Sequence, residues 1–417
     1  MKSFCISLNE SSLNKVFAAA YANDTVRQKL TGNEKISIGE EVINVNWNVN
    51  GKPTVCFKDI DDSREAFDAD GNKLSFNGDM FTVSAPIALK AEESDGSNLP
   101  LEIVAIAYLE NNAVSFKIVG LMIDDKSYTA FDRGILKGIC PDLITSINNV
   151  LGFKDASSKP HIFTLNFLKN LGITAPCQGL QKSSGKIDIW GSSNNNNPYP
   201  NASTDKDYSV IISNELLVDV LNKNFQAHIS ECHCSKDFDK TASAGFLGHF
   251  GVKAHVDAAA RNAVCRGVDG NNLKMGLSPK LNFSGKVILV GTPAGSLGYD
   301  YSFNPDPIPC KANIKFNNNL IHCELNDFDR FGVLLTPTGS VITKIESGLL
   351  WALSEAITNF ITGIIPSVIN IPFDINIPAV DIDLIDNVLL KMNFGSLSTH
   401  FDGGSMSVDG QVTAVVK

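Results

Sequence analysis

The stretch Phe4-Cys5-Ile6-Ser7-Leu8-Asn9 is matched without a gap, 204 residues later, by Tyr208-Ser209-Val210-Ile211-Ile212-Ser213. In the first stretch, large apolar residues alternate with small ones, which is the two-residue period of a β-strand. Each stretch ends on a residue, Asn9 or Ser213, of a type that caps helix N-termini. The matched stretches therefore predict a strand that gives way to a helix at the same point of two repeated halves.

The residues after each stretch recur with the period of a helix. Apolar side chains follow one another at i, i+3, i+4 and i+8, which places them on one helix face. They are Leu13, Val16, Phe17 and Tyr21 in the first copy, and Leu217, Val220, Leu221 and Phe225 in the second. A change of period at matched positions in both copies predicts a structural duplication.

A polar segment rich in Asn and Pro separates the two copies, as a duplication requires. We therefore expect a first domain over residues 1–190, a linker over 191–204 and a second domain over 205–417. Such linkers are exposed, so limited proteolysis is expected to cut there and release two halves.

Antiparallel β-structure is predicted for the middle of each half. Strand-like segments cover 36–49, 52–57, 74–76, 80–83, 101–108 and 114–119, then 249–255, 280–290, 312–316, 320–325 and 331–335. Asp70-Gly71 is a hairpin signal. A second helix closes each half, after Pro141 in the first and over 345–364 in the second. The expected fold class is α+β, with two tandem domains that each wrap a long helix in a strongly curved antiparallel sheet, elongated overall.

The composition excludes several classes of partner. With 43% hydrophobic and 19% charged residues the chain is globular. A net charge of -10 argues against nucleic acid, because phosphate binding needs clustered cations. An odd number of cysteines, nine, predicts mostly free thiols. No secretory signal or membrane-spanning run is found, so the expected location is cytoplasmic, or release without a recognisable signal peptide.

This order of strand, helix, meander, helix and strand, present twice around a linker, resembles the tubular lipid-binding superfamily. The resemblance is to the proteins similar to the bactericidal/permeability-increasing protein and to the accessory proteins of clostridial neurotoxin clusters. It rests on residues 4–21, 208–225, the linker and the apolar segment 345–364. It implies non-catalytic binding of lipid or another hydrophobic ligand in elongated apolar tunnels or grooves.

The resemblance also implies which side chains would line such tunnels. They are Leu13, Val16, Phe17, Ala20, Tyr21, Leu143 and Ile147 in the first domain, and Leu217, Val220, Leu221, Phe225, Leu353, Ile357, Phe360 and Ile361 in the second. Lipopolysaccharide binders of the family have a basic tip, whereas the loop over residues 90–96 is acidic here. Animal members carry a disulfide at a separation similar to that of Cys140 and Cys177, and whether these two are bridged stays open.

Two interpretations of the function are left open. In the first, the ligand is a lipid or a fatty-acid-like molecule. In the second, side chains fill the tunnels, and the protein is an accessory component of a toxin or other complex that contacts proteins or a membrane surface. No catalytic motif, cofactor fingerprint or metal site is predicted. The cluster of His228, Cys232, His233 and Cys234 has no second pair at zinc-finger spacing.

The segment 348–371 is too apolar for burial on one side only, and its single charged residue is Glu355. It is interpreted as the central helix of the second domain, lining a tunnel or packed by the sheet. The alternative is a segment released for membrane insertion. The prolines and alternating apolar residues that follow it favour the first interpretation, with Leu353 and Ile357 facing the interior.

Overall fold

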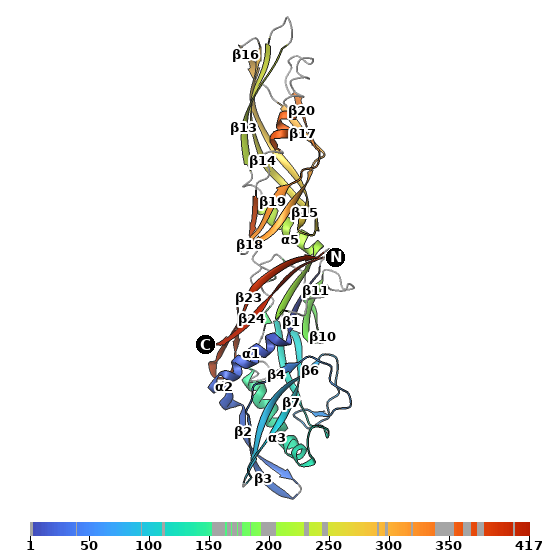
Figure 1. Ribbon diagram of the computed structural model, residues 1–417, viewed down its shortest axis with the longest axis vertical. Helices are drawn as coiled ribbons and strands as arrows, with labels where there is room; N and C mark the ends of the chain where they lie inside the picture. The colour runs from blue at the N-terminus through green and yellow to red at the C-terminus, as the bar shows by residue number, and fades with distance from the viewer. Residues whose placement is uncertain are drawn as a thin grey trace. The chain divides into compact units, whose positions relative to one another are not determined.

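The computed structural model describes residues 3–417 except 39, 93, 111–112, 152–162, 165–167, 169–172, 174–176, 184, 193–205, 229–232, 244–248, 290–291, 297–298, 318–319, 338–353, 362–367, 373–378 and 403–404. The protein is mostly β-structure with some helices, and its antiparallel sheets curl strongly (Figure 1). Unit 1 comprises Met1–Ser213, Asn376–His400 and Met406–Lys417, and unit 2 comprises Asn214–Ile375 and Phe401–Ser405.

A seven-stranded sheet in unit 1 brings the start, the middle and the end of the chain together. Its order is β10 (Cys177–Ser183), β11 (Lys186–Ser192), β1 (Ser3–Asn9), β12 (Tyr208–Ser213), β24 (Ser405–Val416), β23 (Leu389–Asp402) and β22 (Val380–Asp383). Every residue of β1 and β12 is buried, so both faces of these strands are covered.

The predicted switches from strand to helix are confirmed. Strand β1 leads directly into α1 (Glu10–Ala22), and β12 leads directly into α5 (Asn214–His228). The two repeated strands also pair with each other, antiparallel, and Ile6 lies opposite its own repeat equivalent, Val210. The register on either side is symmetric, because Phe4 faces Ile212 and Leu8 faces Tyr208. The repeat therefore has a local two-fold relation centred on the pair Ile6 and Val210.

The predicted N-cap residue Asn9 acts differently from expectation. Asn9 is the N-cap residue of α1 by position, but its side chain makes no capping bond and instead donates to the Lys206 carbonyl. The Ser213 hydroxyl accepts from the Ser3 amide at 3.0 Å. Both side chains thus join β1 to the segment around β12, across 197 and 210 positions of the chain.

Asp207, just before β12, connects three elements. Its carboxylate accepts from Ser11 Oγ at 2.6 Å and from the Val412 amide at 2.8 Å, and it forms an ion pair with Lys15. Its carbonyl accepts from the amide of Asn9 at 3.0 Å. Burial by itself raises the pKa of Asp207, but the hydrogen bonds and the Lys15 ammonium outweigh it and hold this pKa below its ordinary value.

The second sheet of unit 1 is a meander. Its order is β2 (Thr31–Ile38), β3 (Glu41–Val49), β6 (Met80–Ala91), β7 (Ser97–Glu110), β8 (Ala113–Met122) and β5 (Ala66–Phe67), with β4 (Thr54–Cys56) on β6 and β9 (Phe163–Thr164) on β8. The helix α2 (Asp24–Lys29) follows α1, and α3 (Ala130–Val150) follows the meander. The Asp70-Gly71 turn forms as predicted, with Gly71 at a φ of 80°.

Helix α3 corrects the expectation that a helix begins after Pro141. It begins at Ala130, eleven residues earlier, and Pro141 lies inside it. A capping box starts the helix, because Thr129 Oγ1 accepts from the Asp132 amide and the Asp132 carboxylate accepts from the Thr129 amide. This strong start signal decides the boundary, while the proline is tolerated within a helix that buries Leu136, Ile139 and Leu143.

Unit 2 has a second curled sheet. Its order is β13 (His233–Ser243), β14 (His249–Asp269), β15 (Asn272–Leu289), β18 (Ile308–Asn317), β19 (Leu320–Asn326) and β21 (Val368–Pro372), with β16 (Thr292–Ser296) on β15. Strands β17 (Tyr299–Asn304) and β20 (Gly332–Pro337) form a separate pair. Besides α5, residues 354–361 are helical.

The units divide the chain differently from the expected domains 1–190 and 205–417. The physical reason is the seven-stranded sheet, which takes β12 and the strands β22, β23 and β24 into unit 1. The expected linker 191–204 also begins too early, because Gly191 and Ser192 belong to β11 and pair with Phe4 and Ser3. The rest of that segment, 193–204, lies outside the described residues.

Within the described part of the chain, none of the helices is both long enough and apolar enough to span a membrane.

The sheet predicts what a cut in the linker does. A site-specific protease sequence inserted between Asn197 and Pro198 lets the chain be cut after folding. We expect the fragments to co-elute in size-exclusion chromatography, because β1 stays paired with β12. They should separate in denaturant. Separation of the cut protein under native conditions would contradict the β1–β12 pairing, and the uncut insertion variant is the control.

The contacts of Asp207 predict a loss of stability on Asp207→Asn. Hydrogen bonds to charged groups contribute roughly 1.5–3 kcal/mol, so a destabilisation of about 2 kcal/mol at pH 7 is expected. Urea unfolding followed by tryptophan fluorescence measures it, since Trp47 and Trp190 lie in unit 1. Asp79→Asn, at an exposed position before β6, is the matched control.

The same substitution has a predicted pH dependence. The pKa of Asp207 is lowered in the folded protein, so its stabilising effect is present above the unfolded value of about 3.9 and is lost as the pH falls through the lower folded value. The stability difference between the wild type and Asp207→Asn should therefore narrow between about pH 5 and pH 3. A difference that stays constant over this range would show that the Asp207 charge is not what stabilises the sheet.

Candidate functional site

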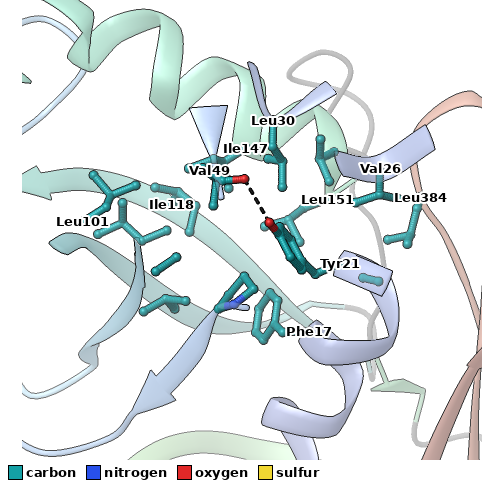
Figure 2. A pocket seen from close by; sticks show the side chains of 16 residues that line it. Phe17, Tyr21, Val26, Leu30, Val49, Leu101, Ile118, Ile147, Leu151 and Leu384 are labelled. Atoms are coloured by element: carbon teal, nitrogen blue, oxygen red, sulfur yellow. Dashed lines mark hydrogen bonds between the residues drawn. The ribbon is translucent and has the colours of Figure 1, made fainter. Parts of the chain in front are cut away.

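An apolar pocket lies inside unit 1 between the two helices of its start, the end of α3 and the meander sheet (Figure 2). Its empty volume is about 630 Å³, counting space that is open to solvent. The lining residues are Phe17, Ala20, Tyr21, Val26, Leu30, Val49, Pro53, Val83, Ala85, Leu101, Ile103, Ile118, Ile147, Val150, Leu151 and Leu384.

The chemistry of the pocket wall is almost uniform. Of the side chains that line it, only Tyr21 carries a polar atom, and its hydroxyl donates to the Val49 carbonyl at 3.1 Å (Figure 2). That bond satisfies the hydroxyl within the protein. The wall therefore offers a ligand dispersion contacts and the hydrophobic effect, with no charged group to bind or to polarise it.

Polar residues at the start of helix α1 hold it in place, and they lie on the same helix face as Phe17 and Tyr21. Asn14 Oδ1 accepts from the Val55 amide at 2.7 Å, and Glu10 Oε1 accepts from the Phe57 amide at 2.5 Å. Residues i and i+4 lie on the same helix face, so the two side chains bind alternate amides, one in β4 and one just after it. This attachment fixes the rotation of α1 and turns Phe17, Ala20 and Tyr21 toward the pocket.

The floor of the pocket consists of cross-strand pairs. Ala85 of β6 lies opposite Leu101 of β7, and Val83 lies opposite Ile103. Paired residues share one sheet face, so all four point to the same side. Ala85 is the smallest of the four, and the space above it belongs to the pocket.

An asparagine joins α3 to this sheet. Asn148 donates to the Ile118 carbonyl at 3.0 Å and accepts from the Ile118 amide at 2.9 Å. Ile118 adjoins a β-bulge, where the register between β7 and β8 shifts. Asn148 thus pairs with both backbone groups of Ile118, as an amide side chain with one acceptor and one donor can. Ile118, Ile147 and Val150 are thereby brought together along one wall.

Four of the predicted lining residues of the first domain do line this pocket. They are Phe17, Ala20, Tyr21 and Ile147. Leu13, Val16 and Leu143 are buried but are not among its lining residues, and they contribute to the core. Sequence reasoning missed the strand residues of the floor and wall. Their alternation in β6 and β7 was visible, but alternation alone does not tell which face is inside.

The predicted residues of the second domain lie in the core of unit 2. Leu217, Val220, Leu221 and Phe225 are buried on α5. Ile357, Phe360 and Ile361 belong to a cluster with side chains from the sheets, in which the rings of Phe238 and Phe360 meet edge to face at 5.5 Å. Leu353 lies outside the described residues.

The two cysteines that the resemblance singled out have thiol pKa values above the ordinary value. Cys140 and Cys177 are both free, so the bridge that the resemblance left open is not formed in the structure. Burial, with the Asp68 charge, raises the pKa of Cys140 to about 12, and burial raises that of Cys177 to about 11. Among the described residues, no group of three His, Cys, Asp or Glu side chains could hold a metal ion.

No protein-family model matches the sequence. No curated protein matches it either.

Solved structures do resemble the chain. The crystal structure of P47 of Clostridium botulinum E1 aligns over 98% of this chain and 98% of that chain, with a TM-score of 0.47 and 9% identity. P47 from Clostridium botulinum A2 aligns over 98% and 97%, with a TM-score of 0.47 and 11% identity. Lipopolysaccharide binding protein aligns over 98% of both chains, with a TM-score of 0.27 and 11% identity. The chain is thus structurally similar to these proteins at low sequence identity, as the resemblance predicted.

Proposed function

We propose that the protein binds the hydrocarbon chain of a lipid or another hydrophobic ligand, without catalysis, in the pocket of unit 1. The observation that carries this proposal is the apolar wall, whose one hydroxyl is already bonded within the protein. In this proposal each unit is a helix held inside a curved sheet, and the pocket is the space that α1 leaves unfilled.

The free energy available supports a hydrocarbon ligand. Each buried methylene contributes roughly 0.8 kcal/mol, so about eight of them contribute roughly 6 kcal/mol before the entropy cost of association. A polar ligand would lose its hydrogen bonds to water and find no replacement along this wall. The wall is also ordered by the Asn148 bonds and by α1, so little further ordering is needed on binding.

A second candidate function applies to unit 2. Among its described residues, the buried face of the helix 354–361 is packed by side chains of the sheets. This packing favours a scaffold role for unit 2, as a surface for a protein partner, over a second ligand site.

The proposal predicts that filling the pocket abolishes tight binding. Ala85→Phe places a ring where the ligand chain would lie. A loss of about three methylenes of contact raises Kd roughly fiftyfold. Binding is measured by the fluorescence of N-phenyl-1-naphthylamine, an uncharged probe, and by its displacement with decanoic acid.

The matched control is Ala88→Phe. Ala88 lies on the same strand, but three positions on and therefore on the opposite sheet face. Both variants should melt near the wild-type temperature, which separates a blocked pocket from a misfolded one. Wild-type protein that fails to bind the probe, or Ala85→Phe that binds as well as Ala88→Phe, would sink the proposal.

Unit 1 has an apolar pocket and the described core of unit 2 is packed, and this difference predicts how many ligands one chain binds. Native mass spectrometry of protein saturated with a fatty acid should show one ligand per chain, because the pocket of unit 1 takes one and the described core of unit 2 is packed. Under the same conditions Ala85→Phe should show a much smaller liganded fraction, in line with its roughly fiftyfold weaker binding. A second ligand that persists in Ala85→Phe would contradict the scaffold role for unit 2.

A further inference from the structure

An exposed ion pair lies next to one end of the pocket. The Lys29 ammonium is 3.1 Å from a carboxylate oxygen of Asp386, and both side chains are about half exposed, at 49% and 50%. Lys29 directly precedes Leu30, and Asp386 lies two residues after Leu384. Both leucines line the pocket.

The pocket has two chemically different ends. Figure 2 shows Leu101 at one end and Val26 with Leu384 at the other. Leu101 is buried on a strand inside the sheet. The end formed by Val26, Leu30 and Leu384 is where the wall passes into the exposed pair of Lys29 and Asp386. At this end a ligand with its hydrocarbon chain in the pocket has two exposed charges close to where its head group would lie.

The backbone presents Asp386 at this end. Asp386 and the next residue, Asn387, adopt positive φ values of 54° and 62°. Asp and Asn are the side chains that tolerate this left-handed conformation best after glycine. The turn places the carboxylate over the end of α2, whose last residue is Lys29.

A charged head group cannot follow its hydrocarbon chain inward. Moving an ionised carboxylate into a wall without hydrogen-bond donors costs far more than a few methylenes contribute. A single-chain anion would therefore stop with its head at the mouth, close to a cation. Asp386 is already paired with the Lys29 ammonium, so an entering anion competes with Asp386 for this cation.

We propose that Lys29 is the head-group site for an anionic single-chain amphiphile of the fatty-acid class, and that the ligand's carboxylate replaces Asp386 at the Lys29 ammonium. This inference rests on the proposed function of the pocket and assigns its ligand class and orientation. Asp386 acts as a stand-in anion that keeps Lys29 paired while no ligand is bound.

The test compares decanoic acid with 1-decanol, which have equally long chains but differ in charge. Each displaces N-phenyl-1-naphthylamine from wild type, Lys29→Met, Asp386→Asn and Lys52→Met. Lys52 precedes another lining residue, Pro53, so Lys52→Met is the control for loss of one positive charge beside the pocket. An exposed ion pair contributes up to about 1 kcal/mol, so the acid should be preferred by about fivefold in Asp386→Asn. The preference should be smaller in the wild type, where the acid has to displace Asp386 from Lys29.

Three results support the inference together. The preference for the acid should vanish in Lys29→Met, persist in Lys52→Met and increase in Asp386→Asn, where the competing anion is gone. It should also weaken at high salt. If acid and alcohol bind equally well to the wild type, or if Lys29→Met keeps the preference, the head-group site is wrong while the pocket function stands. If neither molecule displaces the probe because the probe does not bind, both proposals fall.

Discussion

A strand buried on both faces must have both of its edges hydrogen-bonded, and β1 meets this requirement only through distant segments. Its partners, β11 and β12, begin at Lys186 and Tyr208. Each backbone group left unpaired in such a place would cost roughly 1–3 kcal/mol. The ladder, the Asp207 contacts and the start of α1 therefore depend on one another. Because α1 begins where β1 ends and lines the pocket, this sheet determines where the pocket lies.

The sequence predicted the boundaries between strand and helix well, because these boundaries are encoded by residues that are neighbours in the chain. The strand-to-helix switches at Asn9 and Ser213 follow from period and residue type, and the structure confirms both. The assignment of β12 and the last strands to unit 1 could not be predicted in this way, because strand pairing depends on contacts between distant segments. The start of α3 was missed because the expectation rested on Pro141 and did not include the Thr129 capping box.

The site was predictable in part for the same reason. Helical spacing placed Phe17 and Tyr21 on one helix face, since a helix face can be derived from one segment, and the resemblance added Ala20. The floor residues Ala85 and Leu101 depend on which side of a sheet is inside, and that is decided by what packs on it. Two asparagines show the limit most clearly. Asn148 binds both backbone groups of Ile118, and Asn222 of α5 does the same at Cys265, again beside a bulge. The sequence of a helix alone does not show that one of its polar side chains will bind the backbone of a strand.

The symmetric register of β1 and β12 has a consequence for how such a chain could arise. Pairing in which a residue faces its own equivalent, as Ile6 faces Val210, is the signature of an isologous contact between two identical subunits. Two separate copies of the repeat would make this contact as a homodimer whose stability varies with concentration. Joining them in one polypeptide replaces that dependence with an effective local concentration in the range of about millimolar for a short tether. Fusion also lets the halves diverge, so that one can keep an open interior and the other can close its own.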